Sequence, residues 1–183
     1  SGTFLVEAAM IGANIPANIN REHFAFQDWP DYDEALWKLI RSSQLKRAHD
    51  CYGKVIGYDL NPDTVASAKL NIANSGLEDY IEILCENFFD TKKPEGPTHL
   101  VFNPPYGVRI QGDIPEMYKS IGDTLKKNYS GAEAWFLTSH MDGLKHVGLR
   151  ASRKIEIYQA KLECRFVKYE MYQGSKKMKY KQV

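Results

Sequence analysis

Short apolar segments typical of β-strands alternate with helical patterns along this chain of 183 residues. Strands are predicted at 54–59, 81–85, 100–102 and 132–138. Helices are predicted at 4–11, from about 31 to 45, at 62–74 and at 116–128. Strands joined through helices form parallel sheets, and a final hairpin is predicted at 154–158 and 162–172. The sequence therefore predicts an α/β fold: a doubly wound, mostly parallel sheet with an antiparallel edge strand from the C-terminal hairpin.

One predicted strand ends abruptly in Asn103-Pro104-Pro105-Tyr106-Gly107. Two adjacent prolines have no N–H for a ladder, so the strand must stop there. The Asn103 side chain and the Pro104 carbonyl are then expected at the carboxyl edge of the sheet, where open α/β folds bind ligands. Two acceptor oxygens and an aromatic ring suit a planar base that carries an NH2 group. The alternative is an ordinary proline turn.

The helix that begins the chain follows directly on Ser1-Gly2-Thr3. Such a helix start offers free N–H groups and a hydroxyl to an anion. A nucleotide-binding βα unit also needs a strand before this helix, and none precedes it. We therefore expect the chain to begin inside such a motif, without its first strand and most of its loop.

Two later helices carry sequence signals for their ends and faces. Asp31 and Glu34 have the spacing of a capping box at the start of one helix. Its apolar face is expected to contain Leu36, Trp37, Ile40 and Leu45, and the segment before it is expected to pack onto the domain through Phe24, Phe26 and Trp29. The helix at 62–74 is expected to start after Asn61, to stop at Gly76 and to present Val65, Ala66, Ala68, Leu70, Ile72 and Ala73 to the sheet.

Charge is distributed unevenly although the net charge is only +1. Residues 145–183 contain eleven Lys and Arg against three Asp and Glu. A basic end on an otherwise acidic chain indicates a partner that carries phosphates, or else a solvated basic tail.

Several classes of protein are disfavoured by composition. No apolar run has the length of a membrane span, and the start does not resemble a signal peptide. Cys51, Cys85 and Cys164 are expected to be reduced and mostly buried, as in a cytoplasmic protein. The five histidines show no metal-ligand spacing, so no metal is expected.

Taken together, Ser1-Gly2-Thr3, the stretch 103–109 and the segment 162–165 resemble the class I S-adenosylmethionine (SAM)-dependent methyltransferases with an Asn-Pro-Pro-Tyr motif. The resemblance is close to the large-subunit (23S) rRNA guanine-N2 methyltransferases, whose catalytic domain follows an RNA-binding THUMP domain. It covers essentially the whole chain. It implies the Rossmann-like class I methyltransferase fold and one catalytic domain over residues 1–183, incomplete at its N-terminus, with a basic tail at 174–183.

The resemblance also implies how SAM is held. Ser1, Gly2 and Thr3 would lie near its methionine carboxylate. Asp59 would accept the two ribose hydroxyls, and the alternative for this residue is a role in capping the next helix. The remaining implied contacts to the cofactor come from Asn87, Phe88 and Asn103.

Catalysis is assigned by the same resemblance to Asn103, Pro104, Pro105 and Tyr106. The RNA substrate would be contacted by Tyr106, Gly107 and Arg109. The implied reaction methylates the exocyclic N2 amine of a guanine in 23S rRNA and leaves S-adenosylhomocysteine, with no metal, no membrane and no obligate protein partner. Because related enzymes use similar motifs, a DNA adenine or protein glutamine amide methyltransferase stays open, as does a chain that is inactive by itself.

Overall fold

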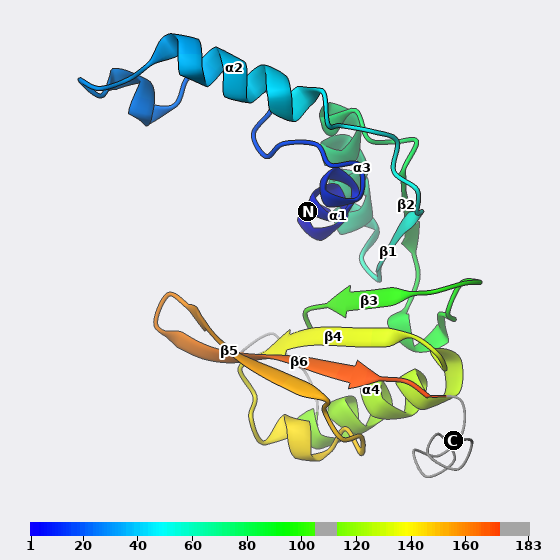
Figure 1. The fold of residues 1–183 in the computed structure, drawn as a ribbon. Coiled ribbons are helices and arrows are strands. Elements are labelled where there is room, and N and C mark those ends of the chain that lie inside the picture. Colours follow the sequence, from blue (N-terminus) through cyan, green and yellow to red (C-terminus); the bar gives the residue numbers. More distant parts are fainter. Residues whose placement is uncertain (105–112, 173–183) are drawn as a thin grey trace, which may run out of the picture. The chain divides into compact units, whose positions relative to one another are not determined.

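The computed structural model describes residues 1–104 and 113–172 (Figure 1). The chain divides into two compact units, Ser1–Phe88 and Phe89–Val183, and each is described by itself. Pro105, Tyr106, Gly107 and Arg109 lie outside the described residues, as does the predicted basic tail at 174–183. The single catalytic domain over residues 1–183 stays a prediction.

The first unit is built around two parallel strands, β1 (Val55–Asp59) and β2 (Ile81–Cys85). Helices α1 (Thr3–Gly12) and α3 (Pro62–Ser75) pack on this pair. The small core contains Ala9, Ile72, Leu77 and Ile81. A Cβ on Gly57 would lie 2.5 Å from a methyl carbon of Leu5, so the glycine lets α1 approach β1 closely.

The predicted ends of α3 are confirmed. The Asn61 side chain accepts hydrogen bonds from the backbone N–H groups of Asp63 at 2.8 Å and Thr64 at 3.2 Å. Gly76 ends the helix with a φ of 68°, a conformation that favours glycine.

The predicted apolar face of α3 was only half right. Val65, Ala68 and Ile72 are buried, whereas Ala66, Leu70 and Ala73 are exposed. The buried residues have helical spacing and share one face of α3, whereas the exposed residues lie outside that face.

Helix α2 (Glu34–Leu45) starts three residues later than expected. The Asp33 side chain, not Asp31, accepts the capping bond from the Leu36 N–H at 2.9 Å. Leu36, Ile40 and Leu45 are exposed, so the predicted apolar face was wrong for them. Of the four residues predicted for this face, Trp37 alone packs as expected, in an aromatic cluster with Phe24 and Phe26.

That cluster explains the segment before α2, which ends in the short helix η1 (Ala25–Asp28). Phe24 and Phe26 stack on each other and meet the Trp37 ring edge-on, at centroid distances of 5.5 and 5.0 Å. Trp29 is 63% exposed, so its predicted packing role was wrong. The segment therefore packs mainly on α2.

The second unit is a four-stranded sheet in the order β3-β4-β6-β5 (Figure 1). Its elements are β3 (His99–Phe102), α4 (Ile114–Asn128), β4 (Glu133–Thr138), η4 (Gly143–Lys145), β5 (Arg153–Gln159) and β6 (Leu162–Glu170). β3 and β4 are parallel, and β6 is antiparallel to both β4 and β5. The hairpin is confirmed, but its antiparallel strand lies inside the sheet, because β5 forms the edge.

Stacked aromatic rings form the core of the second unit. The Phe136 ring of β4 lies 5.1 Å from Phe102 and 5.5 Å from Tyr169, between centroids. Tyr118 of α4 packs edge-on against Phe136, and its hydroxyl is hydrogen-bonded to that of buried Thr138. This packing fixes the strand that leads into Asn103.

Ion pairs neutralise part of the basic hairpin. Lys168 pairs with Glu133 at 2.8 Å and Glu170 at 3.5 Å. Arg165 contacts Glu156 and Glu163 on the same sheet. The phosphate-bearing partner expected from the charge surplus stays a prediction.

All three cysteines are free thiols, as expected, and Cys164 is buried. Cys85 is exposed at the end of β2, so the expectation of mostly buried thiols was wrong there. Within residues 1–104 and 113–172, helices fall short of the length and apolar character needed to cross a bilayer.

Burial of Tyr169 predicts a loss of stability in alkali. Burial raises the pKa of its phenol to about 12, whereas the unfolded chain titrates it near 10. Between these pH values only the unfolded state loses the proton, so the free energy of unfolding should fall as pH rises from about 10 to 12. Urea denaturation at stepped pH measures this, and the Tyr169→Phe variant should show a shallower decline. An equal decline in both proteins would contradict the assignment.

Candidate functional site

Gly2 forms the turn into α1 in a left-handed conformation that favours glycine. Its φ is 74°, and its carbonyl accepts the backbone N–H groups of Leu5 and Val6 at 3.0 and 3.1 Å. A Cβ at this position would lie 3.1 Å from the Cβ of Ala68 on α3. The turn and the close approach of Gly2 to α3 are therefore both favoured by the absence of a side chain on glycine.

Ser1 and Thr3 lie beside this turn. The Ser1 carbonyl accepts a hydrogen bond from the Asn71 side chain at 2.9 Å, and the Thr3 hydroxyl lies 3.3 Å from that of Ser1. The three predicted residues are thus brought together at a helix N-terminus, where backbone N–H groups favour an anion. Sequence reasoning missed Ala68 and Asn71 as supports, because only the folded contact distinguishes them from other helix residues.

Asp59 and Asn87 lie at one edge of the β1–β2 pair. Asp59 ends β1 opposite Cys85, and the Glu86 N–H donates to the Asp59 carbonyl at 3.1 Å. Asn87 follows directly, and Asp59, Asn87 and Phe88 are all half-buried. The structure therefore brings these predicted residues to the carboxyl ends of neighbouring parallel strands.

One oxygen of the Asp59 carboxylate already has a partner. Its Oδ1 accepts the Asn61 N–H at 2.9 Å, which agrees with the alternative role near the start of α3. Within the described residues, Oδ2 has no hydrogen-bond partner. A carboxylate with an open oxygen and a turn without a Cβ at Gly2 fit a ligand that carries hydroxyls and a carboxylate, as SAM does.

Asn103 and Pro104 directly follow β3 in the second unit. Asn103 is exposed, and Pro104 is buried. The strand before them is anchored through Phe102, which lies opposite Phe136 in the parallel register. Among the described residues, the Asn103 amide has no hydrogen-bond partner. An exposed amide next to a fixed proline is the arrangement expected of a rigid acceptor.

Other features do not add to the predicted site. A hollow of about 330 Å³ in the first unit is lined by residues that include Met10, Ile15, Asn18 and Arg21, and none of the predicted cofactor residues lines it. Over residues 1–104 and 113–172, no group of three His, Cys, Asp or Glu side chains could hold a metal ion.

Curated relatives resemble the chain over nearly its full length. It is 32% identical over 182 residues to the ribosomal RNA large subunit methyltransferase K/L of Shewanella frigidimarina, covering 96% of this chain and 25% of the relative. The protein of the same name from Shewanella sp. strain W3-18-1 is also 32% identical, with 96% and 26% covered. The chain thus spans about a quarter of the length of these relatives.

Solved structures share the fold. SMU.472 complexed with SAH superposes with a TM-score of 0.84 at 31% identity, covering 95% of this chain and 46% of that one. A protein from Listeria monocytogenes str. 4b F2365, described as an N6-adenine-specific DNA methylase, has a TM-score of 0.75 at 26% identity, with 95% and 44% covered. These matches confirm the predicted Rossmann-like class I methyltransferase fold.

Residues 1–168 match the family described as UPF0020, RMKL-like methyltransferase domain. The match covers the first unit and most of the second, including the turn at Gly2, the strand end at Asp59 and the strand end at Asn103. The chain belongs to this methyltransferase family.

Proposed function

We propose that this chain is a SAM-dependent methyltransferase domain that methylates the exocyclic N2 amine of a guanine in 23S rRNA. The observation that carries the proposal is the exposed Asn103 amide, fixed at the end of β3 by buried Pro104. Support for rRNA comes from the relatives named large subunit methyltransferases. An rRNA substrate would make the activity cytoplasmic.

The first unit carries the residues proposed to hold the cofactor: Ser1, Gly2, Thr3, Asp59, Asn87 and Phe88. Support comes from the SAH complex of SMU.472, which is 31% identical to this chain. When bound, SAM supplies an electrophilic methyl group on a sulfonium. The open Asp59 oxygen accepts ribose hydroxyls, and the helix start at Gly2 accepts the methionine carboxylate.

Asn103 and Pro104 are proposed to orient the reacting amine. A guanine amine is a poor nucleophile because its lone pair is delocalised into the ring. The Asn103 Oδ1 and the Pro104 carbonyl accept its two N–H bonds, which favours a pyramidal nitrogen with a directed lone pair. The excess proton then leaves to water, so a strong general base is unnecessary. Tyr106 and Arg109, outside the described residues, are proposed to contact the base and the RNA.

A DNA adenine methyltransferase is the second candidate. The specific observation in its favour is the Listeria protein described as an N6-adenine-specific DNA methylase. An adenine N6 amine would present the same two N–H donors to Asn103 and Pro104. The acceptor pair therefore suits both bases, and the substrate must be decided by assay.

Transfer of labelled methyl groups from SAM tests the proposal. The protein is incubated with unmodified 23S rRNA, with DNA and with a glutamine-containing peptide, and label is expected in the rRNA alone. Label found only in DNA or peptide would reject the proposed substrate. Calorimetry with SAH runs in parallel, because a chain that binds no SAH cannot carry out the reaction alone.

Replacing Asp59 with alanine should weaken SAM binding about 30-fold, since hydrogen bonds to a charged group contribute roughly 2 kcal/mol. Asp59→Asn retains the oxygen that accepts the Asn61 N–H, so it should lose less affinity for SAM than Asp59→Ala. Calorimetry gives the Kd, and urea denaturation checks folding. Asp63→Ala, which removes an exposed carboxylate from the first turn of α3, serves as the matched control. Unchanged affinity in Asp59→Ala would refute the assigned contact.

A further inference from the structure

The loop after α2 presents an exposed pair of stacked rings. Tyr52 is 89% exposed, and its ring stacks on His49 with centroids 5.0 Å apart and planes inclined by 26°. Single exposed aromatic residues are common on protein surfaces. A tyrosine supported on one face by a second ring, however, holds a flat surface in a defined orientation.

Two hydrogen bonds hold this loop against the end of α1. The His49 N–H donates to the Ala13 carbonyl at 2.9 Å, and the Asn14 side chain donates to the Arg47 carbonyl at 3.0 Å. These bonds order the loop when the protein folds, so most of the entropy cost of ordering it does not arise on binding. A ligand that bound to it would gain affinity from this preorganisation.

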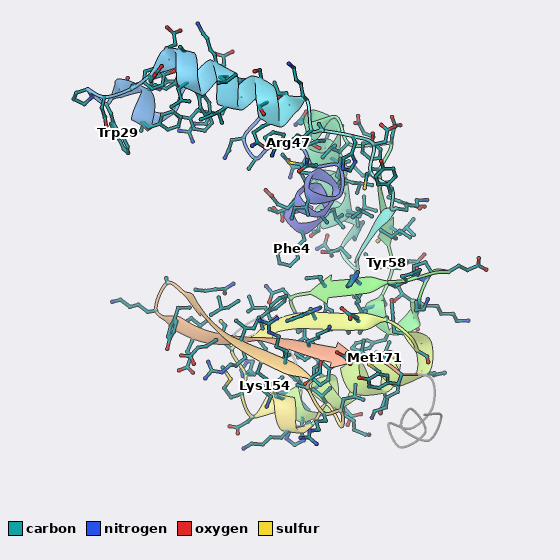
Figure 2. The ribbon with its side chains drawn as sticks, viewed as in Figure 1. Phe4, Trp29, Arg47, Tyr58, Lys154 and Met171 are labelled. Carbon is teal, nitrogen blue, oxygen red and sulfur yellow. The ribbon has the colours of Figure 1, made fainter. Side chains whose placement is uncertain are left out.

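Positive charge accompanies the rings. Lys46 and Arg47 are exposed at the C-terminal end of α2, where Figure 2 labels Arg47, and neither forms an ion pair with another described residue. The nearest acid in sequence, Asp50, accepts a hydrogen bond from the Tyr80 hydroxyl at 3.1 Å. Cations suit a helix C-terminus electrostatically, but that role does not account for the exposed ring pair.

We propose that Lys46, Arg47, His49 and Tyr52, here called the 46–52 surface, bind an unpaired nucleotide of RNA. The base stacks on the open face of Tyr52, and the two cations contact its flanking phosphates. An acidic peptide would satisfy the cations but leave the ring face uncovered. The inference deepens the proposed function, on which it rests, by assigning an RNA contact that lies entirely within the first unit.

Fluorescence anisotropy with a labelled single-stranded oligoadenylate tests this surface on the whole chain, without SAM. Tyr52→Ala should weaken binding about tenfold, because the variant loses the stacking of one base. Tyr52→Phe should bind like the parent. Arg47→Gln should weaken binding and reduce the slope of log K against log salt by about 0.7, the value for one phosphate contact on a single strand.

Matched controls separate this surface from general charge effects. Tyr158 is also exposed, at 62%, but no described ring stacks on it and its neighbours Glu156 and Glu163 carry negative charge, so Tyr158→Ala should not change RNA affinity. Lys38 pairs with Glu34, so Lys38→Gln should leave the salt slope unchanged. The inference would be overturned if Tyr52→Ala bound RNA as tightly as the parent, or if Tyr52→Ala and Tyr158→Ala lost equal affinity. It would also be overturned if oligoglutamate displaced the labelled RNA as effectively as unlabelled RNA does.

The readout is independent of catalysis. A parent chain that binds the oligonucleotide through Tyr52 but transfers no methyl group would uphold the 46–52 surface and refute the proposed reaction. A parent that methylates rRNA while Tyr52→Ala binds the oligonucleotide normally would refute the surface alone.

Discussion

Asn103→Ala is expected to lower the rate of methyl transfer about a thousandfold, while the Kd for SAM changes by less than about tenfold. Asn103 is exposed at the end of β3, and its amide is free to accept an N–H among the described residues. Removing that acceptor leaves the amine unoriented, so the loss should fall on the transfer step. Single-turnover kinetics with saturating SAM measure the rate, and calorimetry measures the Kd.

Asn74→Ala is the matched control for this experiment. Asn74 is an exposed asparagine on α3 whose side chain has no hydrogen bond to another described residue, so its replacement should change neither the transfer rate nor the Kd for SAM. A loss of SAM affinity as large as the loss of rate in Asn103→Ala would contradict the assigned role. It would indicate that the amide contributes to holding the cofactor instead.

Gly122→Ala is expected to destabilise the protein by about 3 kcal/mol, a value at the upper end for overpacking. A Cβ on Gly122 of α4 would lie 1.8 Å from the Val147 carbonyl oxygen, which is backbone and cannot rotate away. The better helix propensity of alanine recovers about 1 kcal/mol at most. The clash therefore dominates, and α4 must move away from the segment after η4.

Urea denaturation measures this loss as a lower midpoint. Gly53→Ala provides the control, because nothing lies within 4 Å of a Cβ at Gly53 and its conformation is open to other residues. It should denature like the parent. If Gly122→Ala were as stable as the parent, α4 could not approach the Val147 backbone as closely as described.

Local signals predicted those parts of the fold that depend on neighbouring residues. Asn61 and Gly76 mark the ends of α3 because capping and left-handed turns involve only a few adjacent groups. The start of α2 was misassigned because Asp31 and Asp33 both precede it. Asp33 caps the helix in the structure, in which Trp37 of α2 packs on Phe24. Sequence signals at the helix start do not reveal that packing.

The candidate site shows the same division. Asp59 and Asn87 could be placed from sequence, because strands in parallel register bring their carboxyl ends to one edge. The contacts of Ala68 and Asn71 with the start of α1 could not be predicted from the sequence, since they join segments far apart in the chain. Leu36 and Ile40 fit a helical apolar pattern, but the structure leaves both exposed.

Nucleoside mass spectrometry of the methylated RNA tests the central claim most directly. Unmodified 23S rRNA is treated with the protein and isotope-labelled SAM, digested to nucleosides and compared with a parallel reaction of Asn103→Ala. The label should appear in N2-methylguanosine with the parent protein and be absent with the variant. Label in a methylated adenosine, or the same yield of N2-methylguanosine from both proteins, would contradict an amine held by Asn103 and Pro104.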